Sequence, residues 1–169
     1  EELYSIALTK IQGLGNIGAY NLIKTLGSAK AVFDNRTNLS DILRLPSRKL
    51  VDALASKEAF AEAEKEILFL EKNKISCITI NGNLYPNRLR NCDDAPIVLY
   101  YRGSCDLNSM RIISVVGTRN ISEYGHAICT QFIHELSELV PDAVIVSGLA
   151  YGVDILSHKT ALSNGLSTI

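Results

Sequence analysis

Two glycine-containing segments combine the residue types that bind an anion. The first, Val115-Val116-Gly117-Thr118-Arg119, joins an apolar run to a glycine, a hydroxyl and a guanidinium. The second begins at Ser147-Gly148, directly after another apolar run. Amide and hydroxyl groups donate hydrogen bonds to phosphate oxygens, and the planar arginine fork fits a phosphate in bidentate geometry. The two segments therefore predict a phosphate-binding edge. Its predicted residues are Gly117, Thr118, Arg119, Ser147 and Gly148.

A parallel α/β sheet would bring these two segments together. Residues 112–116 and 143–146 are short apolar runs, which are typical of buried strands. A helical pattern follows each run, over residues 126–139 and 155–164, and Gly165 is suited to end the second helix. Two strand–glycine loop–helix units in tandem place both loops at the carboxyl edge of one sheet, where α/β folds bind ligands. Neither loop has the Walker A or the Gly-x-Gly-x-x-Gly pattern.

Neighbouring residues are assigned to shaping these loops. The predicted loop-shaping or capping residues are Ser122, Gly125, Gly152 and Asp154. A carboxylate at a helix start accepts from free backbone N–H groups, so capping is the role predicted for Asp154. The alternative for Arg119 is a structural salt bridge, and the alternative for the glycines is tight turning alone. His158 lies on a helical pattern and far from the other histidines, which favours packing over catalysis. The sequence thus predicts a binding site without catalytic residues, metal or cofactor.

Composition limits the possible functions of the chain. The 169 residues suggest one or two domains, and 17 Lys and Arg against 18 Asp and Glu leave the chain near neutral. Nucleic-acid binding would therefore come from a local patch. The four cysteines are scattered without a Cys-x-x-Cys pair, which favours reduced thiols in a cytoplasmic protein. No membrane-spanning run or signal peptide is evident, and residues 167–169 resemble the first residues of a further strand.

Residues 1–73 have helical periodicity throughout. A helix over 3–11 and another over 17–26 flank Gly13-Leu14-Gly15, which resembles a helix-hairpin-helix turn. In a weaker second copy, Leu45-Pro46-Ser47 occupies the place of that turn. After this copy, a charged helix is predicted over about 57–73. Such a turn can bind a DNA phosphate through its amides. Lys10 and Lys24 are the nearest cations, so we predict that this turn contributes little to DNA binding.

Residues from about 75 to 169 resemble the DNA processing protein A (DprA, also called Smf) family. The resemblance rests on four segments, which are Tyr85-Pro86-Asn87-Arg88-Leu89, Leu99-Tyr100-Tyr101-Arg102-Gly103, residues 115–125 and residues 147–154. Val153 stands where the family usually has isoleucine, and Ser157 stands where it usually has alanine. Tyr85, Tyr100 and Tyr101 are predicted to be packing aromatics, with stacking on bases as the alternative.

The resemblance implies a fold and a function. The fold is a Rossmann-like, mainly parallel sheet over residues 74–169, continuing beyond the chain end. A small all-helical domain of helix-hairpin-helix or SAM-like type precedes it over residues 1–73. The family binds single-stranded DNA, protects incoming strands in natural transformation, loads the RecA recombinase and has no ascribed enzymatic activity. It self-associates through the Rossmann-like part, so a homodimer is expected. Further pocket residues and, in many members, a winged-helix domain come after the region matched here.

Two other functions are considered for the same pattern. The lysine-decarboxylase-like (LOG) nucleoside-monophosphate phosphoribohydrolases share a Rossmann-like arrangement with glycine loops. Their Pro-Gly-Gly-x-Gly-Thr signature is not found in these 169 residues. A structural adaptor, with the helical segment as a docking surface for another protein, is the third possibility.

Overall fold

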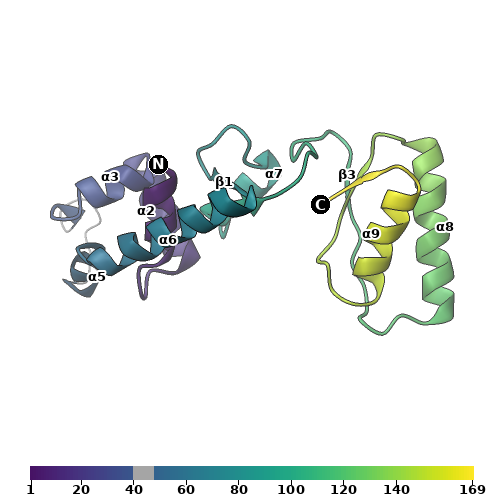
Figure 1. Ribbon diagram of the computed structural model, residues 1–169, viewed down its shortest axis with the longest axis horizontal. Helices are drawn as coiled ribbons and strands as arrows, with labels where there is room; N and C mark the ends of the chain where they lie inside the picture. The colour runs from purple at the N-terminus through teal and green to yellow at the C-terminus, as the bar shows by residue number, and fades with distance from the viewer. Residues whose placement is uncertain (40–47) are drawn as a thin grey trace. The chain divides into compact units, whose positions relative to one another are not determined.

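The chain folds into two compact units. The computed structural model describes residues 1–39 and 48–169 (Figure 1), so the Leu45-Pro46-Ser47 turn of the second copy lies outside the described residues. Contacts divide the chain into Glu1–Gly103 and Ser104–Ile169. Across the two described ranges, no helix is both long enough and apolar enough to cross a bilayer.

The first unit begins with helices, as the periodicity predicts. Their bounds are α1 Glu2–Thr9, α2 Gly15–Leu26, α3 Ala29–Asp34, α5 Arg48–Leu54 and α6 Lys57–Asn73. The turn between α1 and α2 needs glycine for its backbone, because Gly13 and Gly15 have φ of +78° and +57°. A Cβ at either position would meet no atom within 4 Å, so the backbone conformation, and not a lack of space, favours glycine here.

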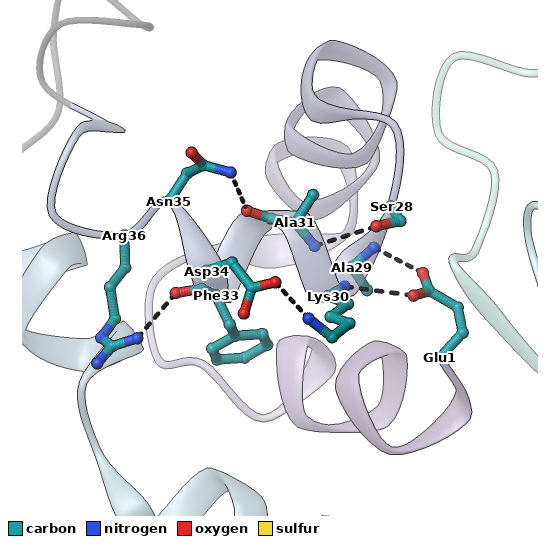
Figure 2. A network of polar contacts seen from close by, with 9 residues as sticks. All are labelled: Glu1, Ser28, Ala29, Lys30, Ala31, Phe33, Asp34, Asn35 and Arg36. Carbon is teal, nitrogen blue, oxygen red and sulfur yellow. Dashed lines mark hydrogen bonds and ion pairs between the residues drawn. The ribbon is translucent and has the colours of Figure 1, made fainter.

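The short helix α3 has hydrogen-bond partners at both ends (Figure 2). The hydroxyl of Ser28 accepts from the N–H of Ala31 at 3.0 Å, and the Glu1 carboxylate accepts from the N–H of Ala29 at 2.6 Å. A carboxylate at a helix N-terminus is favoured by the helix dipole. At the other end Arg36 donates to the carbonyl oxygen of Phe33 at 3.0 Å. These contacts fix the start of the chain against α3.

An antiparallel pair of strands completes the first unit. Strands β1 Ser76–Thr79 and β2 Val98–Tyr101 pair with Ile78 opposite Leu99, and the short helix α7, Asn87–Arg90, lies between them in sequence. Because both strands contact α1, the compact units divide after Gly103, later than the change of pattern at residue 73. The family boundary predicted after residue 73 is not tested by this packing and stays a prediction.

Tyr85 and Arg90 are packing residues of this strand pair. Tyr85 is fully buried, its hydroxyl donates to the carbonyl oxygen of Pro96 at 2.6 Å, and burial raises its pKa to about 12. Arg90 donates to the carbonyl oxygens of Ile80 at 2.9 Å and Gly82 at 2.7 Å. Tyr85 is therefore inaccessible to a base, as expected for a packing aromatic.

The second unit is built on a parallel sheet. Strands β3 Ile112–Ser114, β4 Val144–Val146 and β5 Ser167–Thr168 lie in the order β3-β4-β5, with Ile113 opposite Ile145. Both connections between neighbouring strands contain a helix, α8 Glu123–Leu139 and α9 Val153–Ser163, and the two helices pack together (Figure 1). The parallel arrangement predicted from the repeated strand–loop–helix order is confirmed.

The helices of this unit begin earlier than the sequence predicts. Helix α8 begins at Glu123 rather than at His126, because the Ser122 hydroxyl caps it by accepting from the N–H of Gly125 at 3.1 Å. Helix α9 begins at Val153 rather than at residue 155, with Gly152 as its N-cap. The core between helices and sheet consists of Ile133, Ala143, Ile145, Ala161 and Leu166, all buried.

Glu66 connects three elements of the first unit. Its carboxylate on α6 forms an ion pair with Lys10, which follows α1, and accepts from the Tyr100 hydroxyl on β2. Burial raises the pKa of Glu66, but the hydrogen bonds from Lys10 and Tyr100 outweigh burial and hold the pKa below its ordinary 4.5. The folded unit therefore binds this proton less readily than the unfolded chain does.

We predict a pH-dependent contribution of Glu66 to stability. A carboxylate with a lowered folded pKa stabilises the fold above its unfolded pKa, and this contribution is lost as the pH falls through the folded pKa. Glu66→Gln should therefore lower the free energy of unfolding by about 1 kcal/mol at pH 7 and by less at about pH 3.5. Thermal unfolding at both pH values measures the difference. An equal loss at both pH values would contradict the ion-pair role.

Candidate functional site

The two predicted loops meet at one edge of the parallel sheet. The N–H of Val115 donates to the carbonyl oxygen of Val146 at 2.9 Å, so the pairing of β3 with β4 continues to the end of both strands. The hydroxyl of Ser147 then donates to the carbonyl oxygen of Val115 at 2.6 Å. Because this hydrogen bond uses the only proton of the hydroxyl, Ser147 joins the two strand ends and has no proton left to donate to a ligand.

Gly152 lies directly against the first loop. A Cβ at Gly152 would stand 2.2 Å from the carbonyl oxygen of Thr118 and 2.6 Å from that of Arg119, and its φ is +83°. Only glycine satisfies both the space and the backbone conformation. Gly117 is enclosed from the other side, because a Cβ there would stand 2.6 Å from a methyl of Val153. Gly152 of the second loop thus packs on the first loop, and Gly117 of the first loop packs on Val153.

The helix starts are occupied by the protein's own acceptors. The N–H of Val153, the first residue of α9, donates to the carbonyl oxygen of Thr118 at 3.2 Å. At α8 the Ser122 hydroxyl occupies the corresponding place. Thr118 also uses its hydroxyl locally, accepting from the N–H of Asn120 at 3.2 Å. The free amide donors expected at the helix starts are therefore partly engaged within the loops.

Asp154 is not the cap that the sequence predicts. Gly152 is the N-cap of α9, no side chain caps it, and Asp154 lies inside the first turn. The reason is the close contact of the preceding backbone with Thr118, which only glycine allows at the cap. Asp154 is 5% exposed, and its carboxylate lies beside Gly148, where a Cβ would stand 2.8 Å from Oδ2. Asp154 thus packs closely against Gly148, which shapes the second loop.

His158 connects α9 to the sheet. Its Nδ1 lies 2.6 Å from the Thr168 hydroxyl oxygen, and that hydroxyl donates to the carbonyl oxygen of Ile145 at 2.8 Å. Since the hydroxyl proton is used, Nδ1 is the donor in the first contact. The ring is buried, which agrees with the packing role favoured by the sequence. In the two described ranges, no group of three His, Cys, Asp or Glu side chains is arranged to hold a metal ion.

Arg119 borders a hollow that the sequence did not reveal. The hollow has a volume of about 450 Å³ and is lined by Arg119, Leu149, Ala150, Tyr151 and Ile155. Arg119 is exposed, and among the described residues its guanidinium has no hydrogen-bond or ion-pair partner, so the alternative of a structural salt bridge is not formed. Of the five predicted binding residues, Arg119 alone lines the hollow. Leu149, Tyr151 and Ile155 were missed, because apolar side chains signal a binding role only once their exposure is known.

Comparison with known proteins identifies relatives of the chain. Residues 76–169 match the model of a family described as DNA recombination-mediator protein A. The DNA processing protein DprA of Streptococcus pneumoniae is 32% identical over 166 residues, which cover 98% of this chain and 56% of that protein. The DNA processing protein DprA of Bacillus subtilis is 31% identical over 128 residues, which cover 73% of this chain and 42% of that protein. The chain thus spans about half the length of these relatives.

A solved structure resembles most of the chain. The X-ray structure of DNA processing protein A from Streptococcus pneumoniae aligns with a TM-score of 0.51 and 27% sequence identity. The alignment covers 90% of this chain and 56% of that chain.

We predict that the contact at Gly152 is necessary for the second unit to fold stably. Gly152→Ala combines a positive φ with a Cβ 2.2 Å from a backbone oxygen, so it should lower the free energy of unfolding by more than about 2 kcal/mol. Gly165→Ala is the matched control, because φ is +78° there but no atom lies within 4 Å. It should cost about 1 kcal/mol, the penalty of the left-handed backbone alone. If denaturant titrations gave the same loss of unfolding free energy for both variants, the contact with Thr118 would not contribute to stability.

Proposed function

Because the chain belongs to the DNA recombination-mediator protein A family, we propose that it binds single-stranded DNA at the carboxyl edge of its parallel sheet. The observation that carries the proposal is Arg119, an exposed guanidinium without a partner among the described residues, at the border of the hollow described above. A guanidinium free of protein acceptors is available to a phosphate, which it can bind in bidentate geometry.

The other predicted site residues have supporting roles in this proposal. Thr118 contributes to the turn that carries Arg119, and Gly117, Gly148 and Gly152 allow the two loops to approach each other. Ser147 fixes the strand ends through its bond to Val115. We place the phosphate at Arg119, with backbone groups around residues 117 and 118 and the loop at 147–148 as its neighbours.

The proposal includes a cellular role and partners. A recombination mediator acts between single-stranded DNA and a recombinase, so we propose that this chain protects incoming single strands and promotes loading of RecA in natural transformation. Homodimer formation through the Rossmann-like part is proposed on the resemblance. The order β3-β4-β5, with helical connections and glycine loops at one edge, supports assigning the second unit to a Rossmann-like sheet.

A binding function accounts for the site better than catalysis does. The Ser147 hydroxyl and His158 Nδ1 both donate within the protein. The family description names a mediator, so the phosphoribohydrolase alternative is not favoured. If a nucleoside monophosphate competed with an oligonucleotide at equal concentrations of phosphate, that enzyme class would be favoured again.

We predict that Arg119→Ala weakens binding to single strands of every sequence by about tenfold or more, because a charge-assisted contact to phosphate is lost. The slope of log affinity against log salt should fall in magnitude by roughly 0.7, since one phosphate contact releases less than one counterion on a single strand. Arg119→Lys should restore part of the affinity. Titration of fluorescent oligonucleotides over a salt series measures both quantities.

The matched control for charge is Lys159→Ala. Lys159 is an exposed cation on α9 that does not line the hollow, so its loss changes the net charge equally. It should leave the salt slope within error of the unmodified chain. If folded Arg119→Ala kept both its affinity and its salt slope, phosphate would not bind at this arginine.

A second prediction concerns the turn between α1 and α2. Lys10 is engaged in the ion pair with Glu66, and the Lys24 ammonium lies 5.8 Å from the centre of the Tyr20 ring. Both nearby cations therefore have intramolecular contacts, and Lys10→Ala with Lys24→Ala should weaken binding to single strands by less than tenfold, about 1.4 kcal/mol. A larger loss, in a double variant whose circular dichroism spectrum is unchanged, would assign the turn to the DNA interface.

A further inference from the structure

The loop beside Arg119 presents two apolar side chains to solvent. Leu149 is 70% exposed and Tyr151 is 84% exposed, although both are large and apolar. Leu149 also has φ of +59°, a left-handed conformation that costs a residue other than glycine roughly 1 kcal/mol. Both side chains lie outside the core. The strained backbone at Leu149 is therefore not offset by burial of its side chain. Backbone strain of this kind is typical of binding sites.

The loop is fixed on both sides. The N–H of Ile155 donates to the carbonyl oxygen of Ala150 at 3.0 Å, which joins the loop to the first turn of α9. Gly152 packs on the backbone of Thr118 and Arg119. Tyr151 therefore lies between two anchored points, next to the loop that carries Arg119, and both residues line the same hollow. A loop backbone held in this way loses little conformational entropy when a ligand covers the loop.

The chemistry of the hollow corresponds to one nucleotide. Arg119, whose guanidinium has no partner among the described residues, lies at its border, and Leu149, Tyr151 and Ile155 contribute apolar surface to its lining. A phosphate can bind to the guanidinium, and the flat face of a base can pack on the apolar surface. In a duplex the base faces are already stacked on each other, so an exposed ring favours a single strand. An apolar peptide would leave the guanidinium unpaired under it, which is unfavourable.

We propose that Tyr151 stacks on a nucleobase of single-stranded DNA whose neighbouring phosphate is bound by Arg119. This inference rests on the proposed function and adds to it a contact to the base. Leu149 and Ile155 provide the apolar edge of the same subsite. Stacking does not read hydrogen-bond patterns, so the contact tolerates every base and discriminates single strands from duplex.

The test compares Tyr151→Ala with Tyr151→Phe in the full chain. Tyr151→Ala should weaken binding to a single-stranded oligonucleotide about fivefold or more, the lower end of the range for one stacked base. The salt slope should stay unchanged, because no phosphate contact is lost. Tyr151→Phe keeps the ring and should bind as the unmodified chain does. Tyr124→Ala is the matched control, since Tyr124 is 77% exposed on α8 and does not line the hollow.

An abasic oligonucleotide of equal length separates the base from the phosphate. It keeps every phosphate and removes every base. On this ligand Tyr151→Ala should differ from the unmodified chain by less than about twofold, whereas Arg119→Ala should still lower the salt slope. If Tyr151→Ala weakened binding equally on both ligands, or if Tyr124→Ala had the same effect as Tyr151→Ala, stacking by Tyr151 would be refuted.

The outcomes also distinguish this inference from the proposed function. If the unmodified chain binds single strands and Arg119→Ala alone weakens binding, the function stands and the stacking contact is refuted. If the unmodified chain does not bind single strands at all, the proposed function fails, and the stacking contact fails with it.

Discussion

The site depends on the contact between Gly152 and the carbonyl oxygens of Thr118 and Arg119. A Cβ at residue 152 would lie 2.2 Å from the first of these oxygens, so the two loops approach more closely than any side chain at this position would allow. The approach also aligns the N–H of Val153 with the Thr118 carbonyl oxygen at 3.2 Å. One contact thereby sets the start of α9, the path of the loop after β3 and the position of Arg119.

The same contact changes how an anion can be bound at this edge. In many α/β proteins the helix N-terminus after a glycine loop presents free N–H groups to a phosphate. Here the carbonyl oxygen of Thr118 accepts from the start of α9, and the Ser122 hydroxyl accepts at the start of α8. With part of the amide donors engaged, the proposed phosphate contact depends mainly on the exposed guanidinium of Arg119 rather than on a loop of amides.

Much of this architecture could be predicted from the sequence, and the reasons differ between elements. The apolar runs at 112–116 and 143–146 predicted the parallel strands, because burial on a sheet leaves a strong hydrophobic signal. The first turns of α8 and α9 were missed, although Ser122 and Gly152 were predicted to shape or cap these loops, because the residue at which each helix begins depends on backbone geometry that the sequence does not display. Arg119 could be proposed from the sequence because its chemistry is specific. Tyr151 could not, because the role proposed for it depends on exposure, and an aromatic residue in a short loop is usually packed.

Electrostatics alone would give this chain weak affinity for DNA. The chain carries a net charge of −1, so long-range attraction to a polyanion is absent on average. One phosphate contact contributes a salt dependence of only roughly 0.7, which is far below that of proteins that follow the backbone with many cations. The proposed site, with Arg119 as its phosphate contact, would therefore gain part of its binding free energy from a term that salt does not screen. Apolar contact with bases is such a term, and the exposed surface of Leu149, Tyr151 and Ile155 beside Arg119 is where this fold can provide it.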